Sequence, residues 1–170
     1  MTSVGLDESQ MRSLLLTSKN KTFVVPDTSV VSPVVLPIVP VVALALQRKT
    51  DLRFLLARRG PGQSGEGEWE FPGGKIEQIG GGLYETQQQA LVREIQEELS
   101  LFLSENQLSF VADHRVDYEE KTIQLFLWRA QVEHTPEFIL VDHDAVVWAN
   151  FDEMKNMSIS RGDRPLLSFL

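Results

Sequence analysis

The chain has 170 residues, of which 42% are hydrophobic and 24% charged, with a formal net charge of -8 and no cysteine. This composition is typical of one globular domain with a sizeable core, and it excludes disulfides, thiolate metal sites and cysteine nucleophiles. The negative charge disfavours the binding of duplex nucleic acid over a broad basic surface, while a local nucleotide site remains compatible with it.

Two stretches near the amino terminus are informative about the cellular location of the protein. Residues 33–46 are the most apolar stretch, but their fourteen residues include three prolines, so they are too short and too interrupted to cross a bilayer. Residues 1–13 lack the basic and long apolar segments of a signal peptide. We therefore expect a cytoplasmic protein without a membrane partner. Residues 1–38 are predicted to form an N-terminal extension, followed by one domain over residues 39–170.

Along the domain, strands are predicted over residues 41–47 and 52–59, with a short turn between them. A glycine-rich loop follows over 60–69, then a Pro-Gly-Gly turn within 70–75. A helix is predicted from residue 85 to about residue 99, because this stretch has an apolar period near 3.6 and no glycine or proline. Three more strands are predicted over 107–118, 121–132 and 145–151, and two short helices over 151–156 and 161–170. The whole pattern indicates an α+β domain.

The predicted helix has an apolar face and an acidic one. Leu91, Ile95 and Leu99 share the face that should pack on the core, and a stripe of carboxylates lies beside it, made by Glu94, Glu97 and Glu98. Neighbouring carboxylates repel one another, and a hard divalent cation such as Mg²⁺ or Mn²⁺ compensates such repulsion. The alternative is an acidic face that is only solvated.

The spacing around this helix resembles the signature of the Nudix hydrolases. That signature is Gly, five residues, Glu, seven residues, then Arg-Glu, an aliphatic residue, any residue, Glu-Glu, any residue, Gly and an aliphatic residue. Gly74 and Glu85 match its first fixed positions, and "REIQEELSL" at 93–101 follows after seven residues. Two departures stand out: ten residues separate Gly74 from Glu85, and Ser100 replaces the last glycine. The glycines at 80–82 therefore lie in an insertion, from which Leu83 or Tyr84 could still reach a substrate.

Segments outside the signature resemble the MutT branch of this family, which hydrolyses nucleoside triphosphates such as oxidised dGTP. The matching segments are "FLLARR" at 54–59, "WEFPGGKIE" at 69–77 and "DHDAVVW" at 142–148. The resemblance implies an α/β/α sandwich with a mixed sheet and a central catalytic helix. It also implies a Mg²⁺-dependent enzyme, with Mn²⁺ as a substitute, that releases a nucleoside monophosphate and pyrophosphate.

The resemblance also implies a set of site residues. The catalytic set is Glu94, Glu97, Glu98, Arg93 and Glu85, in which Glu94 is the candidate general base and Arg93 orients the carboxylates. The metal ligands are the Gly74 carbonyl together with Glu94, Glu97, Glu98 and Asp142. The substrate-binding residues are Arg59, Phe71, Lys75 and Asp163.

Several of these roles have alternatives. Asp144 rivals Asp142 as the distal acidic ligand, and Phe71 could be a core residue instead of a stacking partner for a base. Arg59 could be a strand-end charge, and Lys75 could simply pair with a nearby glutamate, Glu77. Asp163 falls where the MutT branch has a purine-reading Asn, so the base is left open. The three histidines are read as loop or surface residues: His114, His134 and His143.

Two other functions compete with triphosphate hydrolysis. One is cleavage of a nucleoside diphosphate derivative, such as a nucleotide sugar or a capped RNA end. The other is a catalytically silent nucleotide-binding domain. All three functions involve a nucleotide partner, and the sequence is compatible with either a monomer or a homodimer.

Overall fold

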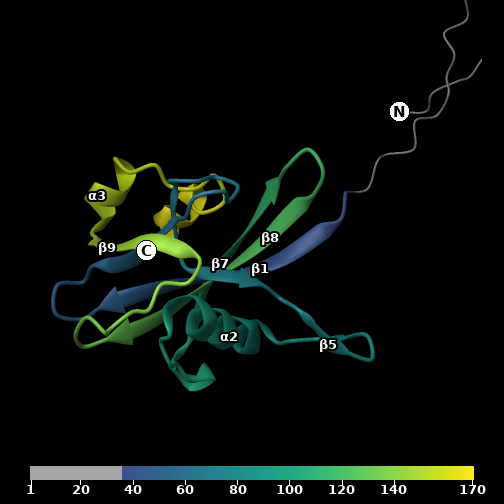
Figure 1. Ribbon diagram of the computed structural model, residues 1–170, viewed down its shortest axis with the longest axis horizontal. Helices are drawn as coiled ribbons and strands as arrows, with labels where there is room; N and C mark the ends of the chain where they lie inside the picture. Colours follow the sequence, from purple (N-terminus) through teal and green to yellow (C-terminus); the bar gives the residue numbers. More distant parts are fainter. Residues whose placement is uncertain (1–35) are drawn as a thin grey trace, which may run out of the picture. The chain divides into compact units, whose positions relative to one another are not determined.

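The central strand of the fold is β1 (Ile38–Arg48), which has neighbours along both edges. The structure, a computed structural model, describes residues 36–170 (Figure 1). On one edge β1 runs parallel to β8 (Thr122–Val132), and on the other it runs antiparallel to β4 (Gly73–Lys75) and then to β2 (Phe54–Arg59). The sheet is therefore mixed, as predicted.

The other strands complete a seven-stranded sheet. β7 (Ser109–Asp117) pairs with β8, while β3 (Trp69–Glu70) and β9 (His143–Ala149) both pair with β2. All five long strands lie where the hydrophobic pattern predicts strands. The prediction for residues 1–38 falls mostly outside the described residues and stays a prediction.

Helix α2 (Gln87–Leu99) forms where the sequence predicts it, beginning two residues later than predicted and ending at the predicted residue. Its start is fixed by a capping box, in which the Thr86 hydroxyl accepts from the Gln89 N–H and the Gln89 amide accepts from the Thr86 N–H. Its end is Ser100, whose φ of 54° is the left-handed conformation that a glycine adopts more easily. The helix therefore exits as in the family signature, with serine in place of glycine.

The two faces of the sheet carry separate cores, because the side chains of β1 alternate between them. Val42, Leu44 and Leu46 pack against the buried face of α2, made by Ala90, Leu91, Ile95 and Leu99. Residues on the opposite face, such as Ala43 and Ala45, pack with the short helices α3 (Phe151–Lys155) and η2 (Arg164–Phe169). Helices on both sheet faces make the predicted α/β/α sandwich (Figure 1). Within the described part of the chain, no helix has the length and apolar character needed to span a membrane.

The insertion before α2 is a β-hairpin, where the sequence predicts only a loop. Strands β5 (Gln78–Gly80) and β6 (Leu83–Tyr84) pair with each other and project from the body of the domain (Figure 1). The turn needs glycine, because residues 80–82 all have positive φ, at 108°, 58° and 80°. Glu77 and Glu85 close the hairpin base: the Glu85 N–H donates to the Glu77 carbonyl, and the Glu77 N–H donates to the Glu85 carboxylate.

Because the hairpin closes on itself, its removal should leave the signature geometry unchanged. Deletion of residues 79–83 is expected to keep kcat/KM within about twofold and to leave substrate preference unaltered, since the Glu77–Glu85 pairing survives. Steady-state kinetics on a nucleotide panel measure this. A changed order of preferred substrates would instead place Leu83 or Tyr84 at the substrate.

Candidate active site

The guanidinium of Arg93 contacts several of the residues that belong to the signature. It donates two hydrogen bonds to Glu85 at 2.8 and 2.9 Å, one to the Glu97 carboxylate at 3.0 Å and one to the Lys75 carbonyl at 3.0 Å. It also lies 3.0 Å from a Glu94 oxygen. Hydrogen bonding to Arg93 lowers the pKa of Glu85. Arg93 thereby ties the middle of α2 to β4 and to the base of the inserted hairpin.

The Gly73–Gly74 segment of β4 packs closely against the acidic face of α2. A side chain at Gly74 would fall on the Glu94 carboxylate, and one at Gly73, whose φ is 152°, would fall on the Val42 carbonyl. The Gly73 N–H donates to the Glu98 carboxylate at 3.2 Å. Glycine is required at both positions because backbone and carboxylates approach so closely.

Burial beside this segment of β4 changes the acidity of two carboxyl groups. It raises the pKa of Glu94, and it raises the pKa of Glu98 to about 7. Nearby charges add to the effect at Glu98, where Glu94 and Glu70 raise the pKa further while His143 lowers it. The cluster is thus costly to keep fully ionised, which is the condition that a bound cation relieves.

The donors of this cluster fit a hard cation by their chemistry. Within residues 36–170, no three His, Asp or Glu side chains stand close enough to hold a metal as they are oriented, because each acidic side chain has another partner. Glu94 and Glu97 turn to Arg93, and Glu98 turns to the Gly73 N–H. The set nevertheless consists only of carboxylate oxygens and a neighbouring backbone carbonyl, which are the ligands that Mg²⁺ and Mn²⁺ prefer.

Of the two rival aspartates, Asp142 lies nearer the acidic helix. Its neighbour Val141 donates its N–H to the Glu98 carbonyl at 3.1 Å, which holds this segment at the end of α2. Asp144 points elsewhere and forms an exposed ion pair with Arg58, which lowers the pKa of Asp144. The geometry therefore favours Asp142 over Asp144 as the distal ligand.

Two members of a chain of polar groups beside the cluster, Glu70 and His143, are absent from the predicted set. Glu70 accepts from Arg59 at 2.7 Å and contacts His143 Nε2 at 3.1 Å, so the prediction that His143 is a loop or surface residue is wrong. Burial lowers the pKa of His143, but the hydrogen bond to Glu70 and the charge of Glu98 outweigh it, and the net shift is upward. The only sequence signal is that Glu70 lies inside the "WEFPGG" segment.

A cavity of about 530 Å³ is lined by all four predicted substrate-binding residues and by Gly73 and Gly74. Lys75 lines it and forms no ion pair with Glu77 or any other carboxylate of the described chain. Arg59 also lines it, although its donors are engaged by Glu70 and the Ser64 carbonyl. Phe71 is buried in the core and presents only part of its side chain to the cavity.

The fourth residue, Asp163, is almost fully buried in the wall of the cavity. Its carboxylate accepts from the Ser160 hydroxyl at 2.7 Å, and burial raises its pKa to about 7. Near neutral pH this group can therefore either accept or donate a hydrogen bond. The lining of the cavity thus combines cationic side chains and glycines with a buried carboxyl group.

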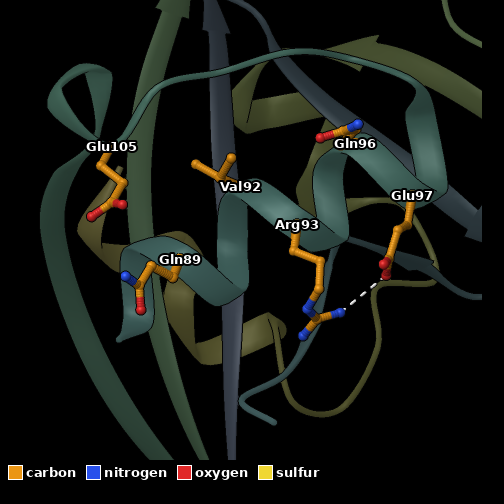
Figure 2. Close-up of a pocket in the computed structure, with 6 residues that line it drawn as sticks. All are labelled: Gln89, Val92, Arg93, Gln96, Glu97 and Glu105. Carbon is orange, nitrogen blue, oxygen red and sulfur yellow. Dashed lines mark hydrogen bonds and ion pairs between the residues drawn. The ribbon is translucent and has the colours of Figure 1, made fainter. Parts of the chain in front are cut away.

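A smaller hollow of about 320 Å³ lies on the outer side of α2 (Figure 2). It shares Arg93 and Glu97 with the cluster, and Figure 2 shows the ion pair between them. Its remaining lining is Gln89, Val92, Gln96 and Glu105. These side chains are amide, aliphatic and acidic, so the hollow offers little to an anionic ligand.

Comparison with known proteins agrees with this site. Residues 37–169 match the NUDIX domain family. A CTP pyrophosphohydrolase of Escherichia coli (strain K12) is 37% identical over 134 residues, covering 76% of this chain and 88% of that protein. The solution structure of the E. coli ORF135 protein superimposes with a TM-score of 0.64 at 31% identity, covering 79% of this chain and 89% of that one.

A MutT protein from Methanosarcina mazei Go1 has the same fold, with a TM-score of 0.67 at 18% identity over 78% of this chain and 92% of that one. The fold and the matched signature therefore define a hydrolase of the NUDIX family. The chain belongs to the NUDIX family, and it is a pyrophosphohydrolase.

The buried Asp163 makes a pH-dependent contribution to stability that can be measured. Its pKa of about 7 in the folded protein exceeds the ordinary value near 4, so the folded state keeps a proton that the unfolded state has released. Between about pH 4 and pH 7 this group lowers the free energy of unfolding as pH rises, by at most about 1.4 kcal/mol per pH unit.

The substitution Asp163→Asn is expected to remove this contribution to the pH dependence of the free energy of unfolding, because the amide keeps the hydrogen bond from Ser160 and does not titrate. Urea unfolding between pH 4.5 and pH 8 compares the two proteins, and Asp152→Asn, an exposed aspartate, serves as the control. Equal slopes for wild type and Asp163→Asn would contradict the raised pKa.

Proposed function

We propose that the protein is a Mg²⁺-dependent pyrophosphohydrolase that cleaves a nucleoside triphosphate to the monophosphate and pyrophosphate. The observation that carries this proposal is the shared position of Gly74. Gly74 lines the large cavity and at the same time packs on the Glu94 carboxylate. A phosphate chain at this end of the cavity would therefore lie beside the acidic face of α2.

The metal would be held by the Gly74 carbonyl, by the helix carboxylates Glu94, Glu97 and Glu98, and by Asp142. When bound, Mg²⁺ offsets the charge of the phosphates, polarises phosphoryl oxygens and makes water a stronger nucleophile. Mn²⁺ prefers similar oxygen donors and would substitute for it.

The protein's own side chains would share the remaining work. Glu94 would accept a proton from the attacking water, a task that suits a carboxylate whose pKa is raised by burial. Arg93 would hold Glu85, Glu94 and Glu97 in place, so it acts as a positioning residue. Lys75 is free to meet a phosphate oxygen, because it has no ion pair in the described chain.

In the wall of the same cavity, Asp163 would read the base, with Arg59 fixing Glu70 beside it. Since the E. coli relative is named for CTP, we infer that CTP is the first substrate to test, followed by oxidised dGTP. Cytoplasmic location and a monomeric or homodimeric state stay predictions.

The decisive experiment is turnover of canonical and oxidised NTPs and dNTPs with Mg²⁺, with product analysis. We expect pyrophosphate and a monophosphate in equal amounts, and no turnover when EDTA removes the metal. Cleavage of nucleotide sugars or dinucleotides alone would favour the alternative substrate class. Nucleotide binding without turnover at any metal concentration would indicate a silent binding domain.

A further inference from the structure

Tyr118 and Arg161 form one wall of the large cavity, and neither belongs to the predicted site. Tyr118 follows β7 in the turn to β8, and Arg161 lies just before η2. The guanidinium carbon of Arg161 lies 5.1 Å from the centre of the Tyr118 ring, which is within the range of a cation–π contact. Two segments that are far apart in sequence thus meet at this wall.

The wall is held in place from both sides. Arg161 Nη2 donates to the Asp117 carbonyl at 3.0 Å, and the Tyr118 N–H donates to the Lys121 carbonyl at 2.8 Å. The buried Thr122 hydroxyl donates to the Asp117 carboxylate at 2.6 Å, which fixes the turn further. The aromatic ring is therefore preorganised, and little freedom would be lost when a ligand contacts it.

The space beside the ring is kept open by a glycine. A Cβ atom at Gly162 would lie 3.8 Å from the Tyr118 hydroxyl, 3.9 Å from Leu125 and 3.9 Å from the Ser160 hydroxyl. These are ordinary contact distances, so the backbone tolerates a side chain, but a branched one would project among these three groups. The apolar side chains of Ile123 and Leu125 line the same cavity.

We propose that Tyr118, held under Arg161, is the stacking wall of the base site, and that a planar heteroaromatic ring binds between it and the apolar lining. This inference rests on the proposed function and adds a specificity-determining residue to it. Stacking on a tyrosine tolerates every base, because each base has a π-face. The wall should therefore separate ligands that carry a base from those that lack one, while Arg161 acts as a positioning residue for the ring.

The test is isothermal titration calorimetry of the full chain with CMP and with ribose 5-phosphate, each in the presence of Mg²⁺. Tyr118→Ala is expected to raise the Kd for CMP about tenfold, whereas Tyr118→Phe keeps it within about twofold. Gly162→Val should raise it by a similar factor, because its methyl groups enter the open space, while Gly162→Ala has a smaller effect. None of these variants should change the Kd for ribose 5-phosphate.

Equal losses for CMP and ribose 5-phosphate, or an unchanged Kd for CMP in Tyr118→Ala, would overturn the inference. Thermal unfolding of each variant shows whether the fold is retained, and Gly162→Val, set against Gly162→Ala, still tests the stacking wall even if Tyr118→Ala unfolds. The two proposals fail separately. If wild type hydrolyses no triphosphate but Tyr118→Ala selectively loses CMP, the proposed function fails and the stacking wall stands.

Discussion

Glu98→Gln is expected to lower kcat by about 10³-fold or more, because it removes a carboxylate from the metal-binding set, and such a loss corresponds to about 4 kcal/mol. The same change should not harm the fold. Burial raises the pKa of Glu98 to about 7, so above that pH the folded protein keeps a costly buried charge. A neutral glutamine accepts the same hydrogen bond from the Gly73 N–H without that cost.

The metal-free Glu98→Gln protein should therefore melt at a higher temperature than wild type at pH 8, and at nearly the same temperature at pH 5. Steady-state kinetics with saturating Mg²⁺ and calorimetry in EDTA measure the two effects. Glu97→Gln should also lose activity without being stabilised, because Glu97 is exposed, with 60% of its side chain accessible. Glu105→Gln on η1 (Glu105–Gln107) is the control and should behave like wild type.

Wild-type turnover by Glu98→Gln would contradict the assignment of this residue to the metal. A loss of activity accompanied by a lower melting temperature would be ambiguous for most buried residues. For Glu98→Gln a lower melting temperature would contradict the raised pKa of Glu98, because removing a buried ionised carboxylate is predicted to raise the melting temperature. Activity and stability are expected to move in opposite directions because function requires this charge to be buried.

The sequence predicted those parts of the site that depend on local spacing. Glu94, Glu97 and Glu98 share a helix face because three and four residues bring a helix back to the same side. Gly74 meets that face because β4 pairs with β1, against which α2 packs. The insertion was also detectable, because ten residues stand where the family has five.

The sequence did not predict the contacts that depend on long-range strand register. Glu70 on β3 and His143 on β9 meet only because both strands flank β2. β9 also carries an irregularity: Arg58 pairs with Ala145 while Arg59 pairs with His143, so Asp144 is the extra residue. A bulge of this kind changes which side chains point inward, and no residue pattern announces it.

Arg93→Lys is expected to lower both stability and activity, even though it keeps the charge. Arg93 bonds to Glu85, Glu97 and the Lys75 carbonyl through a planar fork, whereas a lysine ammonium has no such fork. Glu85 and Glu94 are mostly buried, with 10% and 14% of their side chains exposed, so leaving them partly unpaired costs about 3 kcal/mol. We expect kcat/KM to fall about 100-fold with misplaced carboxylates.

The measurements are urea unfolding and the Mg²⁺ concentration for half-maximal rate, which should rise in Arg93→Lys because the carboxylates are no longer held in place. Arg58→Lys is the matched control. Its bidentate pair with Asp144 has similar geometry but is exposed, so it should cost less than about 1 kcal/mol and leave the Mg²⁺ dependence unchanged. Equal losses in both variants would mean that Arg93 stabilises the fold as any ion pair does. A selective change in Mg²⁺ dependence would mean that it positions the carboxylates for the metal.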